Sequence, residues 1–476
     1  MSVLAQPVLW LELAILAALL GALCVGRLRD PLRAWLWGLA FTAAALACAM
    51  LACLGYYLSR ANGLEADGGA HTDLLGRQLL HIDELNAPLL PMAALLHFLT
   101  ALATGRTKMR RYSLSWSLAS EAIRLTAFGC AEPGLLIGML ALGTVPGYVE
   151  LLNRRKPTQV YLLHMALFVG LLALGWVFYP RGGLTRTAWA TVPLLAAVLI
   201  RCGGVPTHCW LTDWFEHASF GNALLFVTPL TGVYAAVRLV LPVAPDWALQ
   251  SLSLASLLTA VYAAGMATVQ REARRFFAYL FLSHASLVLV GLGLHTPVSL
   301  TGALALWVAV ALALHGFGLT LRALEARFGR LSLADFHGLY EQSPALAMCF
   351  LLTGLASVGF PGTLGFVAAE LLVDGAAEAS PYVALAVALA GALNGIAVLR
   401  VYFLLFTGAR HASSVRLLVG RRERLAILTL AALILGGGLV PQRGVLSRHR
   451  AALDVLRTRD GSGAAANQDP RPPAAE

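Results

Sequence analysis

The feature that most constrains this fold is a long series of apolar runs, each close to the length that crosses a bilayer. A transmembrane helix needs about 20 consecutive apolar residues, and about fourteen such runs follow one another along the 476 residues. Charged residues make up only 13% of the chain, roughly half their share in soluble domains. We therefore expect an all-α polytopic membrane protein with about fourteen transmembrane helices. The runs are 6–26, 34–57, 85–105, 114–130, 134–152, 159–179, 187–204, 219–241, 248–268, 275–294, 298–321, 344–372, 382–406 and 425–440.

The loops between the runs predict the orientation. If the N-terminus lies outside, the inner loops carry 21 Lys and Arg residues and the outer loops carry 4. Basic loops stay on the cytoplasmic side of a membrane, so we expect this orientation. The same loops hold most of the excess behind the formal net charge of +10, and no nucleic-acid partner is expected.

The cysteines give no sign of a metal site. Seven cysteines are scattered through the chain without a CxxC pair, which argues against a disulfide framework and an iron–sulfur site. Cys202, His208 and Cys209 stand close together, but their spacing matches no metal-binding motif. We therefore expect no metal.

Two of the runs are interrupted by Gly and Pro residues. The seventh meets them at 203–206, directly after Arg201, and the twelfth meets them at 359–365. Pro removes a backbone hydrogen bond and Gly adds conformational freedom, so both helices should be discontinuous. Interrupted helices at corresponding positions of two halves indicate an inverted-repeat transporter. Because the two lie five helices apart, the repeats should face opposite ways in the bilayer.

This organisation divides the chain into five parts. The first three helices occupy 1–113, the first repeat (helices 4–8) occupies 114–241, and the second repeat (helices 9–13) occupies 248–406. The last helix is 425–440. The tail at 441–476 carries six arginines and ends in a polar, Pro- and Ala-rich stretch, and we expect it to be disordered.

Charged and titratable residues inside the runs are candidates for function, because they are costly in a membrane. Arg201 stands deep in its run and needs a carboxylate or an anion as partner. Glu121 and Arg124 lie one helical turn apart and can pair with each other; alternatively, Glu121 supplies the partner of Arg201. His284 and His315 lie on neighbouring runs, which fits a proton relay and ordinary buried histidines equally well.

The residues around the first interruption resemble a family signature. They are, in order, Arg201, Pro206, His208, Trp210, Leu211 and Asp213, followed by Gly232, Tyr234 and Arg238. The usual patterns, K-x4-P-x-H-x-W-L-x-D and G-x-Y-x3-R, are those of the antiporter-like membrane subunits of respiratory complex I and of multisubunit cation/proton antiporters. The similarity continues at 275–279, 283–284, His315 and 359–366, and more weakly at 83–86.

The resemblance implies a fourteen-helix fold with two inverted five-helix repeats and a proton half-channel around each broken helix. It also implies no cofactor and partner subunits that carry any redox chemistry. The ion path that it assigns runs through Arg201, His208, His284, His315 and Glu370. Glu121 and Arg124 are candidate charge partners beside this path.

The chain departs from the family where protons should be carried. The glutamate of the fifth run falls at Ala141, the lysine of the seventh is Arg201, and the lysine of the eighth falls at Leu230. The lysine after the histidine of the eleventh run falls at Leu319, and the acid of the twelfth is matched only approximately, by Glu370. Because arginine does not give up its proton in proteins, the sequence leaves open whether the first half conducts.

The resemblance is compatible with three functions. The first is a proton-conducting subunit of a complex I-like or antiporter-like complex in a bacterial inner membrane, part of an NADH-quinone oxidoreductase-like translocase and not a catalyst by itself. The second is the membrane subunit of a two-component system that uses a proton gradient to take up inorganic carbon, with a cytoplasmic zinc protein as partner. The third is a non-conducting membrane anchor. The residues specify neither the coupled ion nor the use of quinone.

Overall fold

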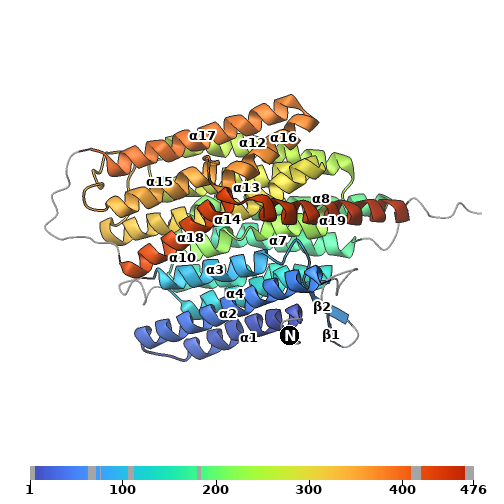
Figure 1. Cartoon of the computed structure of the whole chain (residues 1–476), viewed down its shortest axis with the longest axis horizontal. Coiled ribbons are helices and arrows are strands. Elements are labelled where there is room, and N and C mark those ends of the chain that lie inside the picture. The colour runs from blue at the N-terminus through green and yellow to red at the C-terminus, as the bar shows by residue number, and fades with distance from the viewer. Residues whose placement is uncertain are drawn as a thin grey trace, which may run out of the picture.

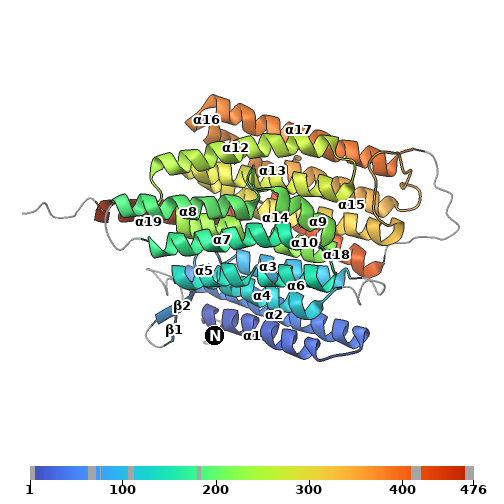
Figure 2. The same cartoon turned by 180° about the vertical axis from the view of Figure 1, so that it is seen from behind.

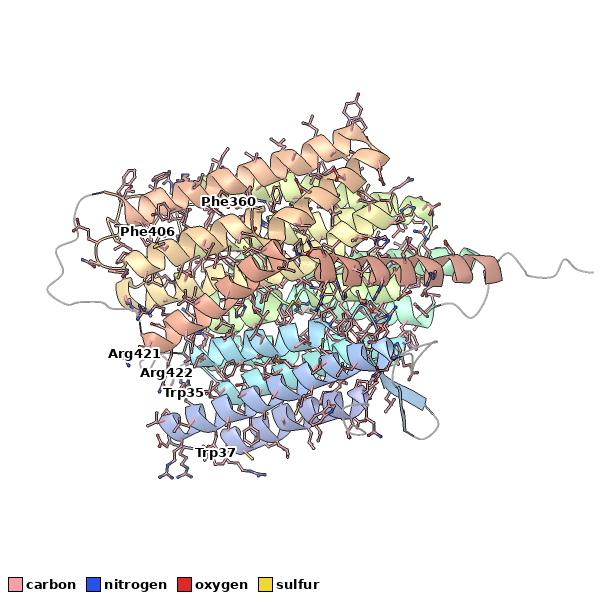
Figure 3. All side chains as sticks on the ribbon, viewed as in Figure 1. Trp35, Trp37, Phe360, Phe406, Arg421 and Arg422 are labelled. Atoms are coloured by element: carbon pink, nitrogen blue, oxygen red, sulfur yellow. The ribbon has the colours of Figure 1, made fainter. Side chains whose placement is uncertain are left out.

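The computed structural model is a bundle of long helices that lie side by side with roughly parallel axes (Figure 1). It describes residues 6–62, 71–74, 77–104, 112–179, 184–408 and 420–466. Two basic segments that support the predicted orientation, 106–111 and 409–419, lie outside the described residues. Arg421 and Arg422 gather with Trp35 at one end of the bundle (Figure 3), and we call this end the basic end.

The first helices form one edge of the bundle. They are α1 (Pro7–Gly26), α2 (Pro31–Ala61) and α3 (Leu89–Leu102), with a short hairpin of β1 (His71–Leu74) and β2 (Arg77–His81) before α3. Asp30 caps α2 by accepting a hydrogen bond from the backbone N–H of Leu32 at 3.0 Å, and Pro31 occupies the first helical position. Both residues are typical helix starts.

The next part of the chain contains several broken helices. Its elements are α4 (Leu114–Gly129), α5 (Pro133–Leu142), α6 (Val145–Asn153), α7 (Gln159–Val177), α8 (Leu184–Cys202), α9 (Cys209–His217), α10 (Phe220–Val227), α11 (Thr231–Ala235) and the π-helical turn η2 (Ala236–Val240). The predicted interruption of the seventh run lies between α8 and α9, where Gly203 has a φ of +79°. Glycine is the residue that adopts this conformation without strain.

A further break, which the sequence interpretation missed, separates α10 from α11. Pro229 stands in the gap, and Leu230 adopts a left-handed conformation with φ +53°. Such a φ is unusual for a leucine. The indole N–H of Trp307 binds the Pro229 carbonyl at 3.1 Å, so a neighbouring helix satisfies a backbone group that the break leaves free.

The last part mirrors this plan with longer helices. It contains α12 (Asp246–Val269), α13 (Ala273–Leu294), α14 (Pro297–Phe328), α15 (Pro344–Val358), α16 (Leu364–Ala379) and α17 (Pro381–Phe406). The predicted interruption of the twelfth run lies between α15 and α16, where Gly359 and Gly362 have φ values of +91° and +84°. The structure thus places both predicted breaks where Gly and Pro interrupt the apolar runs.

The end of the chain differs from the prediction of a disordered tail. Helix α18 (Arg421–Leu439) is followed after an 81° bend by α19 (Gln442–Ala466). Arg448 on α19 is buried and donates hydrogen bonds to the backbone carbonyls of Leu85 at 3.0 Å and Glu84 at 2.5 Å. Disorder was therefore the wrong prediction for 442–466, because these arginines find partners far away in the sequence. Residues 467–476 lie outside the described part.

The centre of the bundle is α13, α14 and the segment Phe220–Val240, whose apolar windows are 83–89% buried. The helices at the edges, such as α1, α7 and α17, are only about a third buried, and their exposed faces are apolar, as expected for lipid contact. Figure 2 shows the same arrangement from behind. The chain is an all-α membrane protein.

The predicted count of fourteen spans remains an expectation. Every predicted run coincides with a helix or with a pair or series of shorter helices. Among the described residues, nine helices are long and apolar enough to cross a membrane by themselves, or ten if the bent pair of α18 and α19 is one span. The boundaries of the two repeats likewise stay predictions.

Candidate functional site: a buried polar axis

His315 lies at the centre of the bundle with both ring nitrogens occupied. Its Nε2 lies 2.8 Å from the hydroxyl of Thr100 on α3, and its Nδ1 lies 3.0 Å from the hydroxyl of Thr228 in the gap after α10. The Thr228 hydroxyl donates its own proton to the Leu224 carbonyl. Nδ1 of His315 is therefore the donor to Thr228, whereas Nε2 bonds to a hydroxyl of Thr100 that can either donate or accept. Each ring nitrogen thus has a hydroxyl partner on a different element.

Helix α3 carries a polar stripe that continues from His315 toward the basic end. The spacing of three polar residues places them on one face of α3 and of the turn that follows it: His97, Thr100 and Thr104. Arg322, one helix over on α14, donates to the carbonyl of Thr100 at 3.2 Å and to the hydroxyl of Thr104 at 2.9 Å. Its guanidinium also lies 5.5 Å from the ring centroid of Tyr112, at cation–π distance.

The stripe meets a second group of polar side chains on α4. Arg124 donates to Nε2 of His97 at 2.5 Å, and Nδ1 of His97 lies 3.4 Å from the hydroxyl of Ser117. Tyr112 shares a hydrogen bond of 2.7 Å with Ser117. Because arginine can only donate, Nε2 of His97 is the acceptor and its proton resides on Nδ1.

Glu121 does not form the predicted pair with Arg124. It is completely buried, and neither carboxyl oxygen has a hydrogen-bond partner among the described residues. The arginine turns its terminal nitrogens to His97 and Ser120. The pairing is absent because α3 offers Arg124 an acceptor on a neighbouring helix, which the spacing along α4 alone does not reveal.

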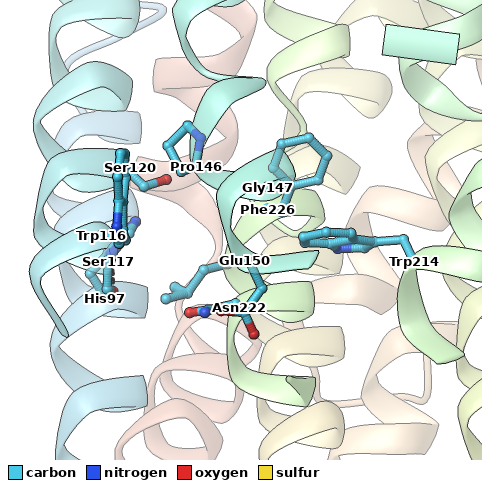
Figure 4. A pocket seen from close by; sticks show the side chains of 11 residues that line it. His97, Trp116, Ser117, Ser120, Pro146, Gly147, Glu150, Trp214, Asn222 and Phe226 are labelled. Carbon is cyan, nitrogen blue, oxygen red and sulfur yellow. Dashed lines mark hydrogen bonds between the residues drawn. The ribbon is translucent and has the colours of Figure 1, made fainter. Parts of the chain in front are cut away.

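A cleft reaches this cluster from the side of α6 and α10. It is narrow, with a volume of about 20 Å³, and its lining includes His97 and Ser117 on one side and Glu150 and Asn222 on the other (Figure 4). Glu150 lies one turn before the end of α6, next to the basic loop at 154–156. The cleft therefore connects the neighbourhood of that loop to His97 through polar side chains.

Arg201 seals the break between α8 and α9. It is buried, donates to the Phe226 carbonyl at 3.0 Å and lies 4.1 Å from the centroid of the Phe226 ring. Trp210 contacts the same guanidinium at 5.7 Å and donates to the Ile200 carbonyl. In the described structure, the groups that act electrostatically on Arg201 are Tyr161 and Cys202, and no carboxylate is among them. A carbonyl and aromatic rings occupy the place of the partner predicted for it.

His284 borders a separate cavity beside the second break. Its Nδ1 lies 2.8 Å from the Leu280 carbonyl. The cavity has a volume of about 350 Å³ and is also lined by Ser357 and Asn394. The amide nitrogen of Asn394 donates to Ser283 at 2.8 Å, and its buried oxygen has no partner among the described residues. An unpaired buried amide oxygen beside a cavity indicates a place for water.

The other two residues predicted for the ion path lie away from this axis. His208 is half-buried and packs against the rings of Tyr262 and Tyr279. Glu370 is exposed on α16. The structure thus brings His315 into the polar axis, places His284 at a cavity, and puts His208 and Glu370 at the periphery.

The positions where the chain departs from the family are apolar gaps in this arrangement. Leu230 is buried in the gap between α10 and α11, and Leu319 is buried one turn after His315. Ala141 lies at the end of α5. These three side chains offer no group that can accept a proton.

Sequence reasoning missed most of the residues that line the axis. None of His97, Thr100, Tyr112 and Arg322 was among the site residues predicted from the sequence. One pattern in the sequence could have indicated the polar axis: polar residues at 97, 100 and 104 in an otherwise apolar helix. Glu150, a glutamate at the end of an apolar run, was a second signal.

The fold and this axis define a class of protein, a polytopic membrane protein with broken helices around buried titratable groups. Residues 130–394 match the family model described as "NADH:quinone oxidoreductase/Mrp antiporter, TM". Since the match covers more than half of the chain, the protein belongs to this family.

Known relatives agree with this assignment. NADH-quinone oxidoreductase subunit 13 of Thermus thermophilus is 30% identical over 254 residues, which are 52% of this chain and 54% of that protein. The chain thus spans about half the length of this curated relative. The fold resembles a chain of respiratory complex I from Thermus thermophilus (TM-score 0.80, 23% identity, 94% and 99% of the two chains) and one of the Mrp complex from Dietzia (TM-score 0.79, 18% identity, 98% and 99%).

Proposed function

We propose that the chain is a proton-conducting membrane subunit of a multisubunit ion-translocating complex and has no redox centre of its own. The observation that carries this proposal is His315, a titratable group buried at the centre of the bundle and hydrogen-bonded on both sides. Ionisable groups in the interior of a membrane protein are expensive and are retained for ion and proton pathways.

The surroundings of His315 support a pathway over an isolated buried histidine. Its partner Thr100 stands on the polar stripe of α3, and its partner Thr228 stands in a helix break. Breaks free backbone groups that can bind ions and water. Polar groups therefore extend from His315 in both directions, and the relatives named above are membrane subunits of proton- and cation-translocating complexes.

The orientation and the partners form part of the same proposal. The bias of basic residues toward one end supports an N-terminus on the outside of a bacterial inner membrane. Other membrane or peripheral subunits would supply the coupled reaction. Purification through this chain, with identification of the accompanying subunits by mass, separates the alternatives. Redox or antiporter subunits support the proposal, and a cytoplasmic zinc protein supports the uptake system.

The experiment that tests conduction uses the full chain, with any subunits that accompany it, in lipid vesicles. Proton uptake driven by a potassium diffusion potential is followed with an enclosed pH-sensitive dye. We expect His315→Ala to abolish uptake. His164→Ala is the matched control, since His164 has only a local bond of 2.8 Å to the Val160 carbonyl, and we expect it to behave like wild type. Equal uptake by all three proteins would contradict the proposal.

A further inference from the structure

Glu121 is the most costly side chain in the first half of the molecule. It is 0% exposed, and both carboxyl oxygens lack a hydrogen-bond partner among the described residues. An ionised carboxylate without partners in an apolar interior costs many kcal/mol, and the group takes up a proton instead. The structure therefore describes a state in which Glu121 is neutral.

The group that could stabilise an ionised Glu121 is close but engaged elsewhere. Arg124 stands one turn further along α4, where residues three apart can meet. Its Nη1 bonds to Nε2 of His97 at 2.5 Å, and its Nε has no partner. While this bond persists, Nε2 of His97 cannot take up a proton. Arg124 thus blocks the histidine and leaves the glutamate uncompensated.

We propose that Glu121, Arg124 and His97 form a proton relay in which the arginine alternates between the two titratable groups. In the state described, Arg124 is bonded to His97 and Glu121 holds its proton. In the other state, Arg124 pairs with the ionised Glu121 and exposes Nε2 of His97. This inference rests on the proposed function and names the residues that carry protons in the first half.

The step between the two states is a proton transfer without any change of electrons. The O–H bond of Glu121 breaks, and an N–H bond forms at Nε2 of His97. The three side chains carry one net positive charge before and after the step. The imidazolium then releases the proton on Nδ1 to the Ser117 hydroxyl, 3.4 Å away. The hydroxyl passes its own proton on to water in the cleft that it shares with Glu150, so that serine and histidine are both neutral after the step.

The charges around the relay fit this scheme. Those that face it are Tyr112 beside Ser117, Arg322 over the Tyr112 ring, His315 within electrostatic reach of His97, and Arg201, which repels Arg124 electrostatically. A second cation nearby favours the state in which Arg124 is neutralised by a carboxylate. The relay also supplies the acidic group that the first half lacks at Ala141.

The experiment compares Glu121→Gln with the control Glu132→Gln, which removes a carboxyl at the edge of α5. Infrared spectra of the purified chain over a range of pH report the stretching band of a protonated carboxyl, and vesicles report proton uptake. We expect Glu121→Gln to lose the band and to lower uptake at least about tenfold, which is roughly 1.4 kcal/mol in the barrier. The control should retain both. Thermal unfolding midpoints check that the variant is folded.

The outcomes separate the relay from the proposed function. A protonated-carboxyl band that persists in Glu121→Gln overturns the relay, and so does unchanged uptake by this variant. Arg124→Gln provides a second test, because without the arginine an ionised Glu121 has no counterion and uptake should fall while the band remains. A wild-type chain that takes up no protons contradicts the proposed function itself.

Discussion

The two predicted helix breaks share a position in the fold but are closed in different ways. Side chains seal the break between α8 and α9, where Arg201 binds the Phe226 carbonyl and Trp210 binds the Ile200 carbonyl. Backbone packing closes the break between α15 and α16, where a Cβ on Gly438 of α18 would overlap the backbone of Gly362 and Thr363. Phe360 in this second break is 53% exposed (Figure 3).

This difference shows that two halves of a repeated fold can share their helix breaks while the side chains at those breaks differ. At the first break the cation Arg201 stands where the family resemblance implies a lysine, and it packs against the rings of Phe226 and Trp210. The second break keeps a cavity with His284 and Asn394 beside it. The geometry of the breaks is thus common to both halves, whereas the groups that could move protons differ.

The largest effect is expected at the second break, from Gly438→Ala. The added Cβ would meet backbone atoms that cannot move away, and overpacking of this kind costs about 3 kcal/mol. The thermal unfolding midpoint and the yield of folded protein measure the loss. Gly436→Ala is the control, because nothing lies within 4 Å of a Cβ there. Equal stability of the two variants would show that α18 does not close this break.

The first break should depend on its cation. Arg201→Ala removes a charged hydrogen bond and a cation–π contact, and we expect a loss of about 2 kcal/mol in the free energy of unfolding. Arg201→Lys should lose less, since an ammonium retains charge but stacks poorly. Arg33→Ala, on a side chain that is 77% exposed, is the control. An unaffected Arg201→Ala would mean that packing alone seals the break.

The cavity at the second break should contribute to conduction. Asn394→Leu removes the buried amide beside the cavity, and we expect proton uptake to fall about tenfold, or roughly 1.4 kcal/mol. Ala388→Leu adds bulk to the same cavity of about 350 Å³ without removing a polar group, and should keep most of the uptake. If Ala388→Leu lowered the uptake and Asn394→Leu did not, the effect would come from the cavity volume and not from the amide.

The smallest effect concerns a contact between the two halves at the basic end. Arg275 binds Glu216 at 2.7 Å, and this hydrogen bond, helped by the charge of the arginine, holds the pKa of Glu216 below its ordinary value. A lowered carboxyl pKa adds stability above the pKa of the unfolded state, and this stability is lost as the pH falls through the folded pKa. For a pair that is 27% and 50% exposed, we expect less than about 1 kcal/mol.

The check is the unfolding midpoint of Glu216→Gln and wild type across acid and neutral pH. The two proteins should differ near neutral pH and converge in acid. Glu378→Gln, at an exposed carboxyl, should show no such convergence with wild type. A Glu216 effect that grew in acid would contradict the sign of this linkage.

The sequence was sufficient for the fold class and for the two predicted breaks, because Gly and Pro act locally on the backbone. It was insufficient for the pairing of Arg124. Spacing along α4 allowed Glu121 as partner, and only the docking of α3 against α4 decides for His97. The tail is a similar case, since composition alone suggested disorder and the acceptors for Arg448 lie at the start of α3.

The break at Pro229 could have been predicted by the same rule that found the other two. A proline in the middle of an apolar run frees a backbone carbonyl, and Pro229 stands inside the run 219–241. The position of Glu370 could not be predicted, because one residue of shift along a helix turns a side chain by about 100° and decides whether it faces the bundle or its surroundings.

The contacts of α19 have a consequence for biosynthesis. Arg448 binds carbonyls 363 and 364 residues earlier in the chain. A ribosome that adds about 5–20 residues per second takes roughly 20–70 s to make the intervening chain. During this time the start of α3 stays in the membrane with those carbonyls unoccupied by their final partner. The first helices inserted are therefore among the last to be completed, and a chain that stalls before α19 should be recognisable to quality-control proteases at that point.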